Sequence, residues 1–193
     1  MAYNLEHLQV QLIEDNPNMR ALVKAMLYAL GLKTVRDHAN GQQAISALEK
    51  FTPDLIITDW MMAPVDGLAY TDFIRTDSSS PDPFTPIILM TGHTEFRRVI
   101  TARDAGVTEL LAKPISARTL YDRILAVIEK PRPFVRTKHF FGPCRRRVNW
   151  DEYLGPEKRL QAGQPARKTD PDLEKIEQLM DLEVDVERIL QSL

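Results

Sequence analysis

The chain has 193 residues, 44% of them hydrophobic and 27% charged, with a formal net charge of −2. This composition indicates a soluble globular domain with an appendage. The single cysteine, Cys144, excludes an intramolecular disulfide, and Lys24 interrupts the longest apolar stretch, which excludes a membrane-spanning helix. The segment MAYNLEHLQV lacks the basic and apolar regions of a signal peptide, so we expect a cytoplasmic protein with no membrane partner.

Charge is unevenly distributed along the chain. Residues 1–130 carry 13 basic and 16 acidic side chains, residues 131–168 carry 10 and 3, and residues 169–193 carry 2 and 8. We therefore predict a domain over residues 1–130, a basic Pro-rich connector over 131–170 and an acidic amphipathic helix over 171–193.

Strand and helix patterns alternate five times through the first 130 residues. The predicted strands are short apolar runs that end in turn signals: LQVQLIED, the weaker run Thr34–His38, PDLIITDW, PIILMTGH and ELLAKP. Helical patterns follow each of them, at about 16–31, 40–50, 68–75, 94–106 and 116–130. This alternation predicts an α/β fold with a parallel sheet.

Chemically capable side chains stand where the apolar runs end: Glu14, Asp15, Asp59, Thr91 and Lys113. Because ligands bind beyond the carboxyl ends of parallel strands, we expect these side chains to share one crevice. Each signal is weak by itself, since an acidic pair, a strand-end threonine or a Lys-Pro turn is common without any function. Five such positions in the right order favour a site for a magnesium ion and a phosphoryl group.

The carboxylates suit two roles. Asp59 ends a strand in a place where it can attack phosphorus and become an acyl phosphate. Mg²⁺ prefers oxygen ligands and usually takes one or two protein carboxylates. We therefore expect Asp15, Asp59 and the backbone carbonyl of Met61 to hold it, with Glu14 acting directly or through water.

The other two positions suit a phosphoryl group. Lys113 is expected to pair with Asp59 at rest and with a phosphoryl oxygen afterwards. The hydroxyl of Thr91 can donate a hydrogen bond to another phosphoryl oxygen, which stabilises a charge-rich transition state.

Residues 8–130 resemble a receiver domain of the bacterial two-component response regulators, of the chemotaxis-receiver type. The matching stretches are LIEDNPNMR, LIITDWMMAPVDGL, IILMTGHTE and LLAKPIS. The resemblance implies a doubly wound five-stranded parallel sheet in the order 2-1-3-4-5 with five flanking helices. It implies that Asp59 is the phosphoacceptor, that Glu14 and Asp15 hold Mg²⁺, and that Thr91 and Lys113 bind the phosphoryl group. The implied donor is the phosphohistidine of a sensor histidine kinase or of a histidine phosphotransfer protein.

The chain departs from the receiver pattern at two places. Receivers commonly have a proline four residues after the phosphoacceptor, where this chain has Ala63 followed by Pro64, although Gly67 keeps its expected distance. Many receivers have an aromatic residue three positions before the lysine, where this chain has Leu110. A leucine rotamer or a backbone shift would then replace an aromatic flip coupled to Thr91.

The C-terminal third carries fewer signals. Residues 131–171 include six prolines and three glycines, which predict an extended or loosely folded connector. The segment FFGPCRRR is similar to a tail segment of some stand-alone bacterial receivers, and we assign it no role. Its Arg145–Arg147 cluster suits an acidic surface or nucleic acid, but an exposed linker is the more common case, so a nucleic-acid partner is not expected.

An apolar seam lies within the predicted helix 171–193: Leu179, Leu182, Val186, Ile189 and Leu193. It is too short for a stable isolated coiled coil. The seam can dock on the receiver, pair with a second copy in a homodimer or bind a partner protein.

No effector motif follows the predicted receiver, so we expect its output to be contact with an unknown downstream protein. We expect no enzymatic activity beyond self-catalysed phosphorylation and dephosphorylation at Asp59. Two alternatives stay open. A phosphatase of the haloacid dehalogenase type needs a second acid two residues after the nucleophile, where this chain has Met61. A receiver-like scaffold would bind its partner without phosphorylation.

Overall fold

The computed structural model describes residues 4–92, 96–137 and 140–144. Met1–Arg147 form one compact unit, and the second unit, Val148–Leu193, lies outside the described residues. The predicted acidic helix 171–193 and most of the predicted connector therefore fall outside them too. Among the described residues, no helix combines the length and the apolar composition that crossing a membrane requires.

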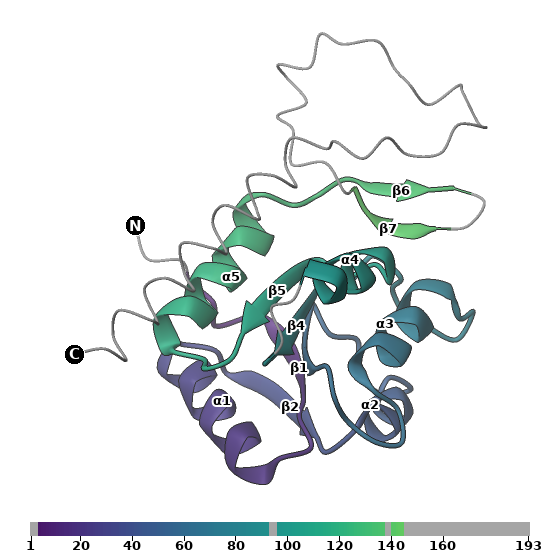
Figure 1. The fold of residues 1–193 in the computed structure, drawn as a ribbon. Coiled ribbons are helices and arrows are strands. Elements are labelled where there is room, and N and C mark those ends of the chain that lie inside the picture. The colour runs from purple at the N-terminus through teal and green to yellow at the C-terminus, as the bar shows by residue number, and fades with distance from the viewer. Residues whose placement is uncertain (1–3, 93–95, 138–139, 145–193) are drawn as a thin grey trace, which may run out of the picture. The chain divides into compact units, whose positions relative to one another are not determined.

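A five-stranded parallel sheet forms the centre of the described part of the chain (Figure 1). Its strands are β1 (Gln9–Ile13), β2 (Thr34–His38), β3 (Leu55–Asp59), β4 (Ile87–Thr91) and β5 (Glu109–Ala112). They lie in the order β2-β1-β3-β4-β5, and all four pairings are parallel. The predicted strand order is confirmed.

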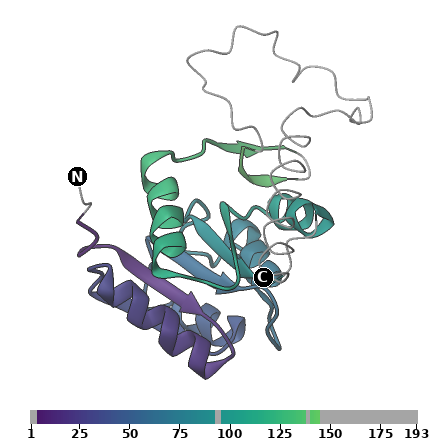
Figure 2. The same cartoon turned by 60° about the vertical axis from the view of Figure 1, so that its left-hand side comes forward.

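Helices cover both faces of this sheet, as Figure 2 shows from a second direction. They are α1 (Pro17–Ala29), α2 (Gly41–Ala47), α3 (Gly67–Thr76), α4 (Phe96–Asp104) and α5 (Ala117–Glu129). The side chains of α1 and α5 pack on one face, against alternate residues of β1, β3 and β4. Those of α2, α3 and α4 pack on the other face. The predicted doubly wound α/β fold is therefore confirmed.

Local sequence explains where most of these helices begin. The side chain of Asn16 accepts hydrogen bonds from the backbone at the start of α1, and Asn40, Asp66 and Ser116 cap α2, α3 and α5 in the same way. Helix α2 is shorter than its pattern predicts. It ends at Ala47 because the chain tightens there into a turn in which Leu48 donates to Ile45.

A polar link crosses one layer of the core. Gln11 of β1 is fully buried and donates to the backbone carbonyl of Ala44 in α2. The buried hydroxyl of Tyr70 in α3 donates to the amide oxygen of the same glutamine. Burial raises the pKa of Tyr70, so the phenol keeps its proton. This link fixes α2 and α3 to β1.

The structure differs from the predicted extended connector at its beginning. Residues Phe134–Arg136 (β6) and Phe141–Pro143 (β7) pair as an antiparallel hairpin, and the compact unit continues past residue 130 to Arg147. The ring of Phe84 packs edge-on against Phe134 and Phe141, with centroids 5.1 and 5.3 Å apart. The rings of Phe134 and Phe141 are tilted against each other, with centroids 5.6 Å apart. The local proline-rich pattern does not predict this hairpin, because Phe84, which the hairpin packs against, lies far away in the sequence.

Candidate functional site

Polar side chains gather beyond the carboxyl ends of four strands. Glu14 and Asp15 directly follow β1, Asp59 and Thr91 are the last residues of β3 and β4, and Lys113 follows β5. The parallel register brings these ends together, since Asp59 lies beside Met90 and Thr91 beside Ala112. The backbone N–H of Lys113 also donates to the carbonyl of Thr91 at 2.7 Å.

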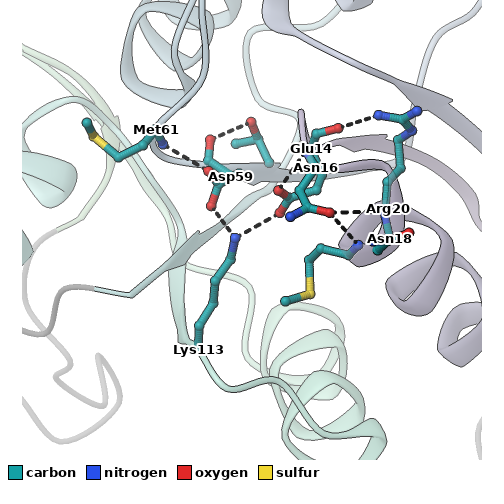
Figure 3. A network of polar contacts seen from close by, with 9 residues as sticks. Glu14, Asn16, Asn18, Arg20, Asp59, Met61 and Lys113 are labelled. Carbon is teal, nitrogen blue, oxygen red and sulfur yellow. Dashed lines mark hydrogen bonds and ion pairs between the residues drawn. The ribbon is translucent and has the colours of Figure 1, made fainter.

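One ammonium group lies between two carboxylates at this edge of the sheet. The Nζ of Lys113 is 2.8 Å from Oδ1 of Asp59 and 2.9 Å from Oε2 of Glu14. Figure 3 shows the lysine side chain pointing between these two acids. Both carboxylates are buried, whereas Asp15 beside them is exposed. The lysine thus links three strands of the sheet through charge.

The three acids form a cluster that fits a hard cation. Each of Glu14, Asp15 and Asp59 offers a carboxylate oxygen, and these oxygens lie within 4.8 Å of one another. Three carboxylates with one ammonium leave an excess of negative charge when all are ionised, and oxygen donors are the ligands that Mg²⁺ prefers. The residues present therefore suit a magnesium ion.

The pKa values of Glu14 and Lys113 are both raised, for different reasons. Burial is the main reason that the pKa of Glu14 lies above its usual 4.5, and the hydrogen bond from Lys113 offsets this only in part. Burial alone would lower the pKa of Lys113, but the hydrogen bonds to Asp59 and Glu14 outweigh it, so that pKa is raised. The ammonium therefore stays charged throughout the neutral range.

The backbone around Asp59 is tightly constrained. Its Oδ2 accepts a hydrogen bond from the backbone N–H of Met61 at 3.0 Å. A Cβ at Gly67 would lie 2.2 Å from the carbonyl oxygen of Asp59, so only glycine fits where α3 begins. A Cβ at Gly41 would lie 2.7 Å from the Val65 side chain of the same loop. The loop with Ala63 and the cis-Pro64 is thus held from both sides.

Met61 is placed at the mouth of the site. Its side chain is 58% exposed, and its backbone N–H points to Asp59. Its expected role as a metal ligand through the backbone carbonyl stays a prediction.

Two supporting residues were not expected from the sequence. The backbone N–H of Asn16 donates to Oε1 of Glu14 at 3.3 Å, and the guanidinium of Arg20 donates to the backbone carbonyl of Glu14 at 2.7 Å. Arg20 also pairs with Asp37 at 3.2 Å, and Asp37 pairs with Lys24. An arginine on the first turn of a helix has no sequence signal for such a role, although its spacing from the acidic pair places it within reach.

The surroundings of Leu110 show which side chain supplies aromatic volume in place of an aromatic residue at position 110. It lies partly buried against a cluster formed by Trp60, Leu89, Ala102 and Val107. Trp60 is itself buried, and the guanidinium of Arg98 from α4 lies 5.7 Å from its ring centroid. Aromatic volume next to the site is thus supplied by the residue that follows Asp59 rather than by position 110. Gly92 is exposed beside the site, and a Cβ there would meet nothing within 4 Å.

Comparisons with known proteins agree with this geometry. The family model described as "Response regulator receiver domain" matches residues 10–125. The chemotaxis protein CheY-3 of Vibrio cholerae serotype O1 is 27% identical over 125 residues, which cover 65% of this chain and 95% of that protein.

Solved structures give the same result. Chemotaxis protein CheY4 of Vibrio cholerae has a TM-score of 0.57 and 28% identity, covering 62% of this chain and 98% of that one. The receiver domain of a sensor histidine kinase from Pseudomonas aeruginosa PAO1 has a TM-score of 0.54 and 32% identity, covering 62% of this chain and 94% of that one. That structure has a magnesium ion coordinated in its active-site cleft.

Proposed function

This chain belongs to the response regulator receiver domain family, and from that membership we propose that Asp59 accepts a phosphoryl group from a phosphohistidine. The donor is a sensor histidine kinase or a histidine phosphotransfer protein. The phosphorylated chain then signals in the cytoplasm through contact with a downstream protein. The chemistry proposed for the chain is its own phosphorylation and dephosphorylation at Asp59.

The observation that carries this proposal is the bridge made by Lys113. A lysine that pairs at 2.8 and 2.9 Å with two buried carboxylates balances charge that the strand ends would otherwise leave unpaired. An exposed acid, Asp15, completes the cluster. The proposed nucleophile Asp59, the ammonium of Lys113 and the acidic group of Asp15 therefore lie close together. Phosphoryl transfer requires such an arrangement.

The chain's own residues divide the chemistry between them. An Asp59 carboxylate oxygen attacks phosphorus, and a P–O bond forms as the P–N bond of the phosphohistidine breaks. Lys113 exchanges its contact with the carboxylate for a phosphoryl oxygen, and the Thr91 hydroxyl donates to another. Glu14, Asp15, Asp59 and the Met61 carbonyl would hold Mg²⁺, which supplies positive charge against the clustered carboxylates and the phosphate.

The exposed face of α1 supports a helical donor. This helix begins two residues after Asp15, and one stripe of it is apolar and exposed to solvent: Ala21, Leu22, Ala25, Tyr28 and Ala29. Small side chains flanked by a leucine and a tyrosine fit a partner helix packed along α1. A phosphohistidine on such a helix would lie next to the acidic cluster.

The two alternatives make different predictions. A phosphatase of the haloacid dehalogenase type would turn over small phosphate esters, and a scaffold would bind its partner equally well after Asp59→Ala. Neither is favoured by the site, because Met61 supplies no second acid and all five chemical positions are present.

The proposal is tested by the mass of the intact protein after incubation with Mg²⁺ and acetyl phosphate. We expect a single labile phosphate adduct in the wild type and none in Asp59→Asn, which keeps the shape of the side chain and an acceptor for the Met61 N–H. An adduct that persists in Asp59→Asn would place the phosphate elsewhere. If neither protein forms an adduct and the cognate kinase also fails to phosphorylate the chain, the alternative of a phosphorylation-independent scaffold is favoured.

The acidic helix 171–193 stays a prediction, and we propose that it forms a homodimer contact through its apolar seam. Charged replacements at Leu182 and Ile189 should then reduce the dimer fraction in sedimentation experiments. An unchanged oligomeric state and unchanged partner binding would reject that role.

A further inference from the structure

The segment Phe140–Cys144, from the unassigned FFGPCRRR stretch, packs closely on the receiver body. A Cβ at Gly142 would lie 2.9 Å from the Cα of Gly106, and a Cβ at Gly106 would lie 3.2 Å from the carbonyl oxygen of Phe141. The backbone N–H of Cys144 donates to the carbonyl of Pro133 at 2.7 Å, and the Cys144 side chain is buried. Because Gly106 and Gly142 have no Cβ, β7 lies closer to the receiver body than it could with any other residue at these two positions.

Arg75 is the centre of the surface that receives the hairpin. This buried residue at the end of α3 donates to the backbone carbonyls of Gly106, Pro83 and Thr85. The face of Phe134 covers its guanidinium, with the ring centroid 5.1 Å from Cζ. These carbonyls precede β4 and β5, so the hairpin lies at the amino-terminal edge of the sheet, opposite the acidic cluster.

The hairpin depends on this docking for its structure. An isolated two-stranded hairpin is marginally stable in water, and β6 and β7 have only three residues each. Their contacts with Phe84, Arg75 and Gly106 therefore decide whether the hairpin forms.

Helix α4 connects the two edges of the sheet. It begins at Phe96, shortly after Thr91 and Gly92, and it ends just before Gly106, which terminates it with a φ of +92°. Among its described side chains only Ala102 is buried, whereas α1, α3 and α5 bury two, five and three residues. A helix that buries so little apolar surface can shift at low cost.

We propose that the β6–β7 hairpin is a releasable latch whose docking on Gly106 and Arg75 depends, through α4, on the state of Asp59. This inference rests on the proposed function. A phosphoryl group at Asp59 attracts the hydroxyl and the N–H groups of Thr91 and Gly92, the residues that lead into α4. Drawing the beginning of a rigid helix toward the site moves its end away from Gly142, which releases the latch.

Burial of Arg75 keeps the docking reversible. Its Nη2 is buried and has no hydrogen-bond partner among the described residues, and burial lowers its pKa to about 10. Release of the hairpin returns this charged group to water, which offsets part of the lost apolar contact.

The single cysteine of the chain gives a direct readout of the latch. The rate of maleimide labelling at Cys144 is measured on the full chain with and without Mg²⁺ and acetyl phosphate, and adduct formation is followed by intact mass in the same sample. We expect phosphorylation to raise the labelling rate at least about fivefold, the lower end of typical allosteric coupling. In Asp59→Asn the rate should not respond.

The possible failures are distinguishable. An adduct with an unchanged or slower labelling rate overturns the latch and leaves the proposed function standing. Absence of the adduct overturns both.

A matched pair of variants tests the docking surface without phosphorylation. Phe84→Ala removes a half-exposed ring that the hairpin packs against, and Tyr28→Ala removes a comparably exposed ring on α1, with exposed fractions of 53% and 46%. Labelling of Cys144 should accelerate in Phe84→Ala and stay at the wild-type rate in Tyr28→Ala. Equal rates in the two variants would overturn the proposed docking.

Discussion

Lys113 holds together charges that belong to different strands, and its position decides how the resting site behaves. Asp59 and Glu14 are both buried and both contact the same Nζ. Without that ammonium, two carboxylates would face one another with little water to screen them. The lysine therefore has a structural role in the resting protein in addition to its proposed role in phosphoryl binding.

Lys113→Met should reveal the structural role. We expect the variant to lose about 3 kcal/mol of unfolding free energy at pH 7, because a buried charge pair loses one partner. Mg²⁺ should raise its Tm more than it raises that of the wild type, since the cation replaces the missing positive charge. Thermal unfolding with and without MgCl₂ measures both effects. Lys33→Met, which removes a mostly exposed lysine, is the control, and an equal response in both variants would contradict the prediction.

Asp37 pairs with Arg20, which donates to the backbone carbonyl of Glu14. The pH dependence of stability therefore tests this network. Burial raises the pKa of Asp37, but the hydrogen bond and charge of Lys24 and the charge of Arg20 outweigh it, so the pKa lies below its usual 3.8. A depressed carboxyl pKa stabilises the folded state above pH 3.8, and this contribution is lost as the pH falls through the folded-state pKa. Asp37→Asn should therefore cost about 1 kcal/mol at pH 7 and progressively less below pH 3.8. Urea unfolding across this range measures it, and a cost independent of pH would show that packing rather than charge is lost.

At the scale of elements, the proposed phosphoacceptor Asp59 and helix α3 constrain each other through the loop that joins β3 to α3. The amide of Gly67 donates to the carbonyl of Trp60 at 3.0 Å, while its Cα lies against Asp59. Asp66 caps α3 one residue earlier. The start of α3 therefore determines the backbone position of Asp59.

Two glycines, one in contact with Asp59 and one directly after Thr91, should respond differently to alanine. Gly67→Ala is expected to cost about 3 kcal/mol or more and to abolish the phosphate adduct, because its Cβ would overlap the backbone of Asp59. Gly92→Ala should change stability by no more than about 0.5 kcal/mol, since open space surrounds its Cβ. Chemical unfolding and intact mass of both variants test this pair. Similar costs at the two positions would contradict the geometry.

The elements also show what sequence can predict. Asp59 and Thr91 were predictable because each directly ends a run of apolar residues, and parallel strands bring such ends together. The support from Arg20 and the replacement of an aromatic at position 110 by Trp60 depend on side-chain contacts across elements, which spacing does not encode. The β6–β7 hairpin was missed for the same reason: its strands contain Gly142 and Pro143, and Phe84 stabilises it from about 50 residues away.

At the scale of the molecule, the position of the domain boundary can be measured by truncation. A chain ending after Arg147 should keep the unfolding free energy of the receiver. A chain ending after Lys130 should lose about 2 kcal/mol, because it uncovers Phe84 and Arg75. Urea unfolding of the two truncated chains and the full chain distinguishes these outcomes. Equal stability of the two truncated chains would support the domain boundary at residue 130 that the sequence predicts.

The Lys113–Glu14 ion pair joins residues 99 positions apart in the chain. During synthesis the first acids of the cluster emerge long before their lysine, and contacts of such large sequence separation form late in folding. Every fragment that ends before β5 therefore lacks the ammonium that its own carboxylates need. Competence to accept phosphate should therefore arise only when nearly the whole receiver has left the ribosome and folded.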